Sequence, residues 1–288
     1  MKSGYISIIG KPNVGKSTLL NRLLKIKLSI VTAKPQTTRK RILGILTEGE
    51  YQCYFLDTPG VIEPSYALQE QMVKQIKKAL TDADIIIWMI DPWFKPEDYP
   101  ETFLKACKKK PVLCVINKID LVQKGELLKV IDEVKELPVK EIIPISALNG
   151  NGLEACKKNI FKYLHENPFL YPEEDLSDQP ERFFVAELIR EKVFTSFSKE
   201  IPYSTCVLID EFKERERGKD FIRAIIYVER KSQKGILIGK DGEALKKVGE
   251  QARRAIEGFL GRGVYLELWV KVKEKWRKDK KFLKELGY

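Results

Sequence analysis

The feature that most constrains this chain is a glycine-rich loop between an apolar stretch and a helical pattern. Residues 10–17 have the sequence Gly-Lys-Pro-Asn-Val-Gly-Lys-Ser, which matches the phosphate-binding pattern G-x-x-x-x-G-K-[ST]. The apolar run Tyr5–Ile9 precedes the loop, and leucines at helical spacing follow it. Glycines allow backbone N–H groups to approach phosphate oxygens, and the helix N-terminus attracts the same negative charge. This order of apolar strand, glycine-rich loop and helix predicts a nucleoside triphosphate site.

The side chains at the end of this loop have separate expected roles. Lys16 should reach the β- and γ-phosphates, and the Ser17 hydroxyl should bind Mg²⁺. The loop residues expected to contact the nucleotide are Gly10, Lys11, Pro12, Asn13, Val14, Gly15, Lys16 and Ser17.

A motif at the end of a second apolar strand indicates which base is bound. Residues 117–120, Asn-Lys-Ile-Asp, follow the apolar run 111–116. The Asp120 carboxylate can accept from both N1–H and the N2 amine of guanine, which adenine lacks, so discrimination of about 10⁴-fold is expected. Backbone N–H groups at residues 146–147, after the strand 142–145, can contact guanine O6. The residues expected at the base are Asn117, Lys118, Asp120, Ser146 and Ala147.

A third motif, Asp-Thr-Pro-Gly, ends the strand expected at 51–56. Asp57 can hold Mg²⁺ through water, and the Gly60 N–H can meet the γ-phosphate. The residues expected to act here are Asp57, Thr58, Pro59 and Gly60. Because open α/β sheets bind ligands at the carboxyl ends of their strands, the three motifs predict one shared site.

Together these motifs resemble the translation-factor class of small GTPases. The segment 34–39, Lys-Pro-Gln-Thr-Thr-Arg, resembles switch I of the Era, Der and MnmE group of bacterial GTPases. The resemblance implies that Thr37 or Thr38 coordinates Mg²⁺ when the γ-phosphate is present. Thr38 is the preferred assignment, although the sequence alone does not choose between them.

One position departs from signalling GTPases. Those proteins have a glutamine after Asp-x-x-Gly that orients the attacking water, whereas this chain has Val61 and Ile62. We therefore expect slow intrinsic hydrolysis of GTP. Asn13 resembles a position that binds K⁺ in related GTPases, and it is equally compatible with a simple tight turn.

Composition excludes several classes of protein. The longest strongly apolar stretch, Ile85–Ile90, is too short to cross a bilayer, and no signal peptide is expected because the start leads directly into a strand. Five cysteines without C-x-x-C spacing are expected to be reduced and mostly buried. His165, the only histidine, is expected to be structural or exposed, which excludes histidine-based catalysis.

Positive charge is concentrated in the C-terminal part of the chain. Of the net charge of +11, residues 181–288 contribute +8, from 26 Lys and Arg and 18 Asp and Glu. A basic surface concentrated in one domain indicates a polyanionic partner, either nucleic acid or an anionic membrane surface, and the alternative is a lysine-rich solvated surface.

A second domain is predicted after a proline-rich acidic linker. Its pattern gives a helix at 183–197, strands at 205–212 and 221–228, a Gly-x-x-Gly loop, a helix at 243–260 and a strand at 264–272. This α-β-β-α-α-β order resembles a type II KH domain. A Gly-x-x-Gly match is weak alone, and 258–261 is a second one, but only residues 239–242 stand where that fold places its RNA loop. The expected RNA-binding residues are Ile236, Ile238, Gly239, Lys240, Asp241, Gly242, Lys246 and Arg253.

The C-terminal tail, basic and aromatic, is expected to end in a short helix with Trp276, Phe282, Leu283 and Leu286 partly packed. With it, the chain resembles the Era family along its whole length. The fold class expected is α/β, a doubly wound, mostly parallel GTPase sheet at 1–168, followed by a linker at 169–180 and a smaller α+β KH domain at 181–288.

This resemblance implies a cytoplasmic GTPase that uses Mg²⁺, with K⁺ as a further candidate, and binds GTP and GDP. It further implies binding to small-subunit (16S) ribosomal RNA near its 3′ end, a role in assembling the small ribosomal subunit, and peripheral contact with the inner face of the cell membrane. No stable oligomer is expected. Two alternatives remain, a GTPase acting mainly at an anionic membrane and one acting in RNA modification. The RNA-modification alternative is disfavoured, because the C-terminal half of the chain offers no cysteine constellation, histidine or cofactor loop for such chemistry.

Overall fold

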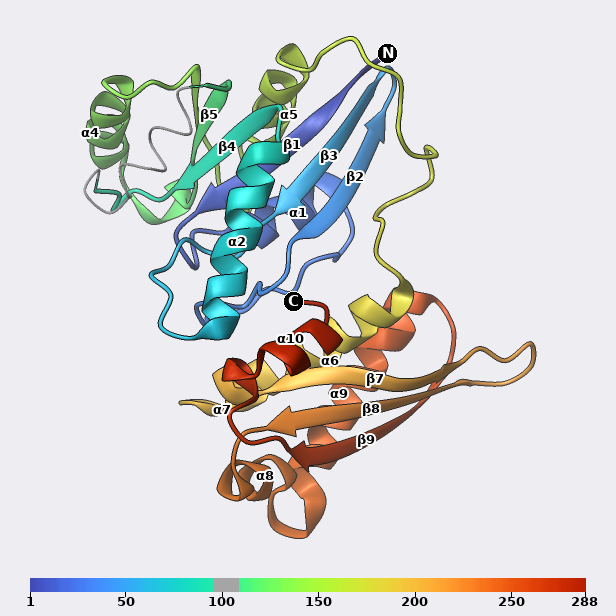
Figure 1. The fold of residues 1–288 in the computed structure, drawn as a ribbon. Coiled ribbons are helices and arrows are strands. Elements are labelled where there is room, and N and C mark those ends of the chain that lie inside the picture. The colour runs from blue at the N-terminus through green and yellow to red at the C-terminus, as the bar shows by residue number, and fades with distance from the viewer. Residues whose placement is uncertain (96–108) are drawn as a thin grey trace. The chain divides into compact units, whose positions relative to one another are not determined.

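The computed structural model describes residues 1–95 and 109–288, which form two compact units (Figure 1). The first unit comprises Met1–Ser29, Thr38–Glu63 and Met72–Asp178, and the second comprises Ile30–Thr37, Pro64–Gln71 and Gln179–Tyr288. Thus two short segments from the N-terminal half group with the C-terminal part of the chain.

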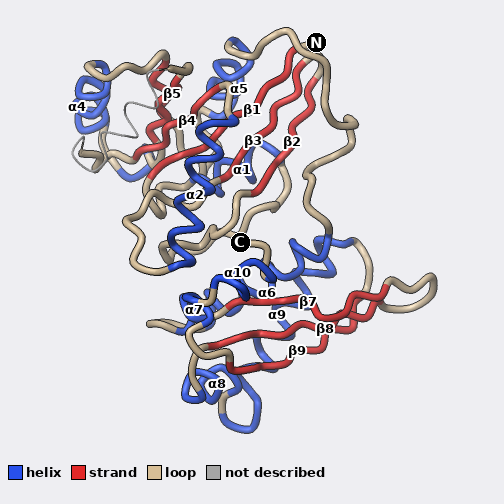
Figure 2. Tube along the Cα trace, in the orientation of Figure 1, coloured by secondary structure: helices blue, strands red, loops and turns tan. Residues whose placement is uncertain are grey.

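The first unit is built on a six-stranded sheet in the order β2-β3-β1-β4-β5-β6 (Figure 2). Only β2 runs antiparallel to its neighbour, so the expected mostly parallel sheet is confirmed. The strands are β1 (Lys2–Gly10), β2 (Ile42–Glu48), β3 (Tyr51–Asp57), β4 (Ile85–Ile90), β5 (Val112–Ile116) and β6 (Glu141–Pro144).

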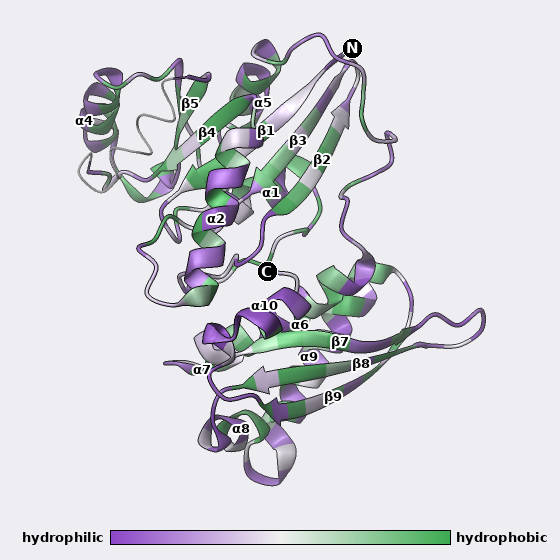
Figure 3. Ribbon diagram, viewed as in Figure 1, coloured by the Kyte–Doolittle hydropathy of each residue, from purple (hydrophilic) through white to green (hydrophobic). Residues whose placement is uncertain are grey.

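Helices cover both faces of this sheet, as the doubly wound class requires. On β2, Gly44 has no side chain, and a Cβ there would lie 2.6 Å from Leu24 of the phosphate-loop helix. The neighbouring residues Leu43 and Ile45 point to the other face, where they pack with Ala79 of α2. Strands β4 and β5 are buried at every position, and β4 is coloured hydrophobic along most of its length in Figure 3. The helices are α1 (Lys16–Leu24), α2 (Ala67–Asp82), α4 (Lys124–Lys135), α5 (Leu153–Lys162) and the short η2 (Ile119–Leu121).

The segment expected as a linker, 169–180, is held against β2 and β3 over its first part. The Leu170 N–H donates to the Tyr54 hydroxyl at 2.8 Å, and the Ile45 N–H donates to the Leu176 carbonyl at 2.9 Å. The two compact units divide between Asp178 and Gln179. The domain bounds given above stay a prediction.

The second unit has a three-stranded sheet in the order β7-β8-β9, with an antiparallel and then a parallel pair. Helices α6 and α9 pack on it through a core that includes Val185, Ile189, Val248 and Ile256. The predicted α-β-β-α-α-β order is confirmed. The elements are α6 (Glu181–Ser196), α7 (Ile201–Ser204), β7 (Cys206–Lys213), β8 (Asp220–Val228), α8 (Lys231–Ile238), η3 (Lys240–Gly242), α9 (Glu243–Leu260), β9 (Val264–Val272), η4 (Trp276–Lys278) and α10 (Lys280–Glu285).

The C-terminal tail is packed more tightly than expected. All four apolar residues anticipated as partly packed are buried, and the Trp276 indole N–H donates to the Ser204 carbonyl at 2.7 Å. The buried indole therefore contributes a large apolar contact, and its N–H is not left without a hydrogen bond.

Several smaller expectations can be placed in the structure. Four cysteines are buried thiols, as expected, whereas Cys107 lies outside the described residues. His165 is exposed and its carbonyl accepts from the Ser3 N–H. In the described part of the chain, no helix has the length and apolar character needed to span a membrane.

Candidate functional site

The structure brings the three strand-end motifs together at one edge of the first sheet. Strands β1, β3, β5 and β6 all point the same way, so their carboxyl ends meet. The phosphate loop follows β1, Asp57 ends β3, and Asn117 follows β5. This edge is where ligands bind in open α/β sheets.

The phosphate loop is closed around the Lys16 side chain. Lys16 is only 6% exposed, and its ammonium donates to the Gly10 carbonyl at 3.0 Å and the Lys11 carbonyl at 2.9 Å. Burial lowers the pKa of Lys16 to about 8, against the opposing attraction of Asp57. A buried cation whose hydrogen bonds go to backbone carbonyls is well placed to bind phosphate.

The tight conformation of the loop depends on one glycine in particular. Gly15 has φ of +105°, and a Cβ there would lie 2.2 Å from the Asn117 amide nitrogen. Asn13, the candidate K⁺ residue, is exposed with φ of +62°. That conformation agrees with the turn interpretation of Asn13, since Asn tolerates the left-handed region.

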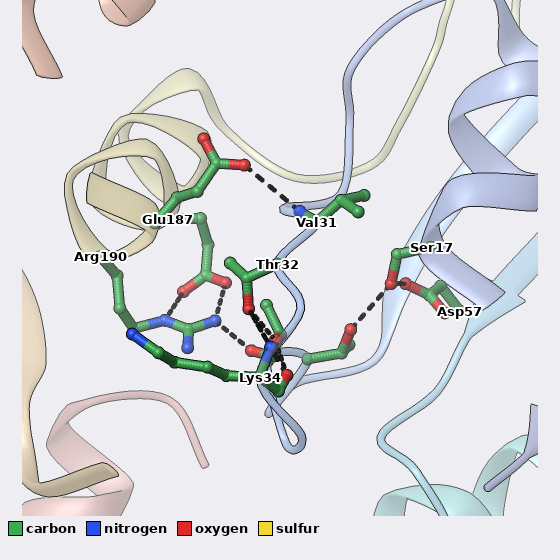
Figure 4. A network of polar contacts seen from close by, with 10 residues as sticks. Ser17, Val31, Thr32, Lys34, Asp57, Glu187 and Arg190 are labelled. Carbon is green, nitrogen blue, oxygen red and sulfur yellow. Dashed lines mark hydrogen bonds and ion pairs between the residues drawn. The ribbon is translucent and has the colours of Figure 1, made fainter. Parts of the chain in front are cut away.

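Three oxygen-bearing side chains converge beside Lys16. The Ser17 hydroxyl donates to Asp57 Oδ2 at 2.7 Å, and Thr38 Oγ1 lies 2.9 Å from Ser17 Oγ (Figure 4). Asp57 Oδ1 is buried and has no hydrogen-bond partner among the described residues. Burial raises the pKa of Asp57, and Lys16 and the neighbouring hydroxyls oppose that shift. Two hydroxyls and a carboxylate with an unpartnered oxygen are a donor set that fits a hard cation such as Mg²⁺.

The Asp-Thr-Pro-Gly motif lies directly against the phosphate loop. The Val61 N–H donates to the Gly10 carbonyl at 3.2 Å, and a Cβ on Gly60 would lie 2.7 Å from the Pro12 nitrogen. Thr58 is fixed by a hydrogen bond of 2.8 Å from its hydroxyl to the Ile8 carbonyl. The Val61 side chain packs against a buried apolar cluster, so this position has no polar group to orient a water.

Asn117 connects the phosphate loop to the loop expected at the base. Its amide nitrogen donates to the Val14 carbonyl at 2.8 Å, and its amide oxygen accepts from the Ala147 N–H at 2.8 Å. The Ser146 N–H donates to the Asn151 carbonyl at 3.0 Å. Both N–H groups predicted for guanine O6 therefore have partners in this structure.

The Asp120 carboxylate, by contrast, is exposed and forms no hydrogen bond with a described residue. Its neighbour Lys118 lies 3.2 Å from an Asp91 oxygen and 5.8 Å from the centre of the Trp93 ring. A carboxylate free of partners at this edge is available to a base.

Two further residues of α1 were not found from the sequence. Arg22 donates through Nε to the Ala147 carbonyl at 3.2 Å and through Nη2 to the Leu148 carbonyl. The Asn21 amide oxygen accepts from the Ser29 N–H at 2.8 Å, and its nitrogen donates to the Ser29 carbonyl at 2.7 Å. These contacts hold the base loop and the backbone at Ser29, which precedes the switch I segment. Both residues lie in an ordinary amphipathic helix, so no sequence pattern marks them.

The Gly-x-x-Gly loop of the second unit has the backbone that its glycines predict. Gly239 and Gly242 have φ of +76° and +79°, and a Cβ on Gly239 would lie 2.7 Å from the Ala244 Cβ. Lys240 and Asp241 are exposed at the tip.

The other predicted RNA-binding residues differ in availability. Ile236 is 52% exposed and Lys246 is exposed, whereas Ile238 is half-buried. Arg253 pairs with Glu257 on its own helix at 2.8 Å, so it is less available than Lys246.

Comparisons with known proteins cover the whole chain. A family model described as a 50S ribosome-binding GTPase matches residues 5–118, and a KH domain model matches residues 200–277. The GTPase Era of Clostridium botulinum is 47% identical over 292 residues, covering 100% of this chain and 98% of the relative. The chloroplastic GTPase ERA1 of Zea mays is 46% identical over 100% of this chain and 70% of its own length.

Two solved structures are similar over the full length. A variant of Aquifex aeolicus Era bound to GDP and AlF4⁻ gives a TM-score of 0.95 at 45% identity, covering 100% of this chain and 99% of that one. A complex of Era with MgGDPNP and nucleotides 1506–1542 of 16S ribosomal RNA gives 0.95 at 44% identity with the same coverage.

The depressed pKa of Lys16 leads to a pH prediction. Phosphate binding needs the ammonium form, and in the free protein that form is lost as pH rises through about 8. We expect the affinity for GDP to be constant below that pH and to fall by up to about tenfold per pH unit above it. Titration calorimetry between pH 7 and 9 measures this. Lys16→Met should bind weakly without that pH dependence, and constant affinity of the unmodified protein across the range would contradict the assignment.

Proposed function

The chain belongs to the Era family of GTPases, and we propose on that premise that it binds GTP with Mg²⁺ and hydrolyses it to GDP and phosphate. We propose further that the surface around Gly239–Gly242 binds small-subunit ribosomal RNA, so that the protein acts in assembly of the small ribosomal subunit. The cluster of Ser17, Thr38 and Asp57 beside the buried Lys16 is the observation that carries the nucleotide half of this proposal.

At the phosphates, Lys16 supplies a cation to the β- and γ-oxygens, and the backbone N–H groups of the loop supply further donors. Mg²⁺, when bound, neutralises charge that develops between these phosphates. Ser17 and Thr38 are the proposed direct ligands, and Asp57 the proposed ligand through water. Thr38 is favoured over Thr37 because the Thr37 hydroxyl donates to the Lys34 carbonyl at 2.7 Å.

At the base, the exposed Asp120 carboxylate is the proposed acceptor for guanine N1–H and N2 amine. Asn117 positions the loop at Ala147, whose N–H is proposed to turn from Asn117 to guanine O6 when the base enters. This exchange of one acceptor for another leaves the buried N–H satisfied in both states.

Hydrolysis is proposed to be slow without a further group, because Val61 is apolar and packs against a buried apolar cluster. A K⁺ ion bound by Asn13 is the proposed completing group, since a cation between the phosphates stabilises developing charge.

The RNA half of the proposal is supported by charge and by a relative. Lys240 and Lys246 are exposed at and beside the Gly-x-x-Gly loop, and such loops clamp single-stranded nucleotides in KH domains. The Era protein in the complex above binds the 1506–1542 segment of 16S RNA, and we propose the corresponding 3′ region as the target here. A cytoplasmic monomer with peripheral membrane contact remains part of the proposal. Measuring binding of the protein to RNA and to anionic liposomes distinguishes the RNA-binding function from a function mainly at the membrane.

The base assignment is tested by Asp120→Asn. An amide that can donate disfavours guanine but suits xanthine, which has a carbonyl in place of the N2 amine. We expect GTP affinity to fall by about 100-fold or more and XTP affinity to rise. Fluorescent-nucleotide displacement measures both, and an unchanged GTP affinity would remove Asp120 from the site.

The completing cation is tested by salt exchange. We expect GTP turnover to be several-fold higher in K⁺ than in Na⁺ at equal ionic strength, because K⁺ is the cation proposed to complete the site. Asn13→Ala should reduce this difference while GDP affinity is kept. Equal phosphate release in both salts argues against K⁺ and leaves the nucleotide assignments intact.

The RNA surface is tested in the full chain by Lys240→Asp. The variant keeps both glycines and replaces a cation with a carboxylate facing the RNA backbone. We expect affinity for a single-stranded RNA of the 3′ region to fall at least about tenfold, or about 1.4 kcal/mol. Arg217→Asp, which makes the same charge change in the exposed β7–β8 turn, should have a much smaller effect. Equal effects of the two variants would show that only overall charge matters.

A further inference from the structure

One face of the sheet in the second unit is left largely open by the helices of that unit. Ile222 of β8 belongs to the core that the strands share with α6 and α9, and Figure 1 shows α9 behind the strands. Because side chains alternate along a strand, Arg223 and Ile225 lie on the opposite, open face. Helix α10 covers the end of this face at Tyr227, whose ring centre lies 5.1 Å from that of Phe282.

Aromatic rings stand exposed on the open face. Trp269 is 51% exposed and Tyr265 is 60% exposed. The Tyr265 ring is stacked on Phe221, with ring centres 5.9 Å apart and 15° between the planes. The Trp269 indole N–H donates to Glu267 Oε1 at 2.8 Å, which orients the indole. Large aromatic rings that are exposed yet held in place are typical of contact surfaces.

A surface pocket of about 340 Å³ lies beside the exposed indole. Its lining residues come from all three strands and are Asp210, Arg223, Ile225, Trp269 and Lys271. Ile225 is buried and lies opposite Trp269 in the register of β8 and β9, so these two residues form an apolar wall. The volume is at the lower end of the range for ligand pockets, which suits one long side chain.

The charged residues of the pocket differ in how far they are already paired. Arg223 donates through Nε to Glu267 Oε2 at 2.9 Å, and its Nη1 lies 3.2 Å from a Glu211 oxygen. Asp210 is 3.9 Å from the same Nη1, and 45% of its side chain is exposed. Lys271 forms no ion pair with a described residue. Two carboxylates therefore balance Arg223 closely, whereas Asp210 remains available to a further donor.

The charge of this face differs from that of the unit as a whole. Its acidic residues are matched in number by its basic ones, and they are Asp210, Glu211 and Glu267 against Lys213, Arg223 and Lys271. Residues 181–288 together carry a net charge of +8. Every nucleotide of a single-stranded RNA brings a phosphate, so a neutral face with carboxylates beside the pocket is a poor match for RNA.

We propose that this open face binds a basic segment of a partner protein, with one arginine side chain of that segment in the pocket. The guanidinium stacks on the exposed Trp269 ring and donates to Asp210. Lys271 donates to a backbone carbonyl of the segment. Arginine suits the pocket better than lysine because its planar head can stack on an indole and donate hydrogen bonds at the same time. The pocket shares no residue with the proposed RNA surface, so this inference is independent of it.

The test uses the full chain and the blocked peptide acetyl-Gly-Gly-Arg-Gly-Gly-amide as the probe. Binding is followed by NMR through the indole N–H signal of Trp269, which is assigned by its loss in Trp269→Phe. We expect a saturable shift with a dissociation constant in the millimolar range, because one side chain supplies the contact. The same peptide with glutamine in place of arginine should bind at least about fivefold more weakly, since it lacks the charge-assisted hydrogen bond.

Two substitutions in the pocket have effects of opposite sign. Asp210→Asn removes the proposed acceptor and should weaken binding of the arginine peptide by about threefold, the size expected for an exposed charge pair. Lys271→Gln removes a nearby cation and should strengthen binding by up to about twofold. Glu214→Gln is the matched control, because it removes an exposed carboxylate from the β7–β8 turn and should change nothing.

A single-stranded hexauridylate in place of the peptide tests whether the face binds RNA instead. For RNA the signs reverse, because Lys271 attracts phosphate and Asp210 repels it. If hexauridylate shifts the Trp269 signal, and Lys271→Gln weakens that binding while Asp210→Asn strengthens it, the face is an RNA surface and the proposal is wrong. Equal binding of the arginine and glutamine peptides, equal effects of Asp210→Asn and Glu214→Gln, or no saturable shift with the arginine peptide also overturns it.

Discussion

A buried carboxylate with one unpartnered oxygen organises the nucleotide edge of this protein. Asp57 is held at the end of β3, where the parallel register with β1 places it beside the phosphate loop. The Ser17 hydroxyl satisfies one oxygen, and the other has no partner among the described residues. Because an unsatisfied buried carboxylate is costly, this arrangement is stabilised by whatever cation completes it. Lys16 and Thr38 lie beside this carboxylate, where both can take part in binding a cation and phosphate.

The same edge shows how few side chains connect several separate loops. Asn117 bonds to the phosphate loop through one end of its amide and to the base loop through the other. Arg22 holds the base loop from helix α1, whose first turn carries Lys16 and Ser17. A loop fixed by hydrogen bonds on both sides loses less entropy when a ligand binds, which is the advantage of a preorganised site.

Much of this was accessible from the sequence because the constraints are local. A glycine that must adopt φ of +105°, or a lysine that follows it by one residue, leaves a fixed spacing in the chain. The same holds for Gly239 and Gly242 in the second unit. Strand β2, antiparallel at the sheet edge, and the packing of residues 169–177 along it have no such spacing, and the sequence did not reveal them.

The sequence by itself determined the phosphate loop, the base motif, the order of elements in the second unit and the apolar residue at position 61. Each depends on neighbours within a few residues, where backbone geometry and periodicity are decisive. The tertiary structure decided which threonine faces Ser17, and that Arg190 contacts the segment before it. Thr38 and Ser17 are 21 positions apart and Arg190 and Thr37 are 153 positions apart, and no local pattern encodes a hydrogen bond at either distance along the chain.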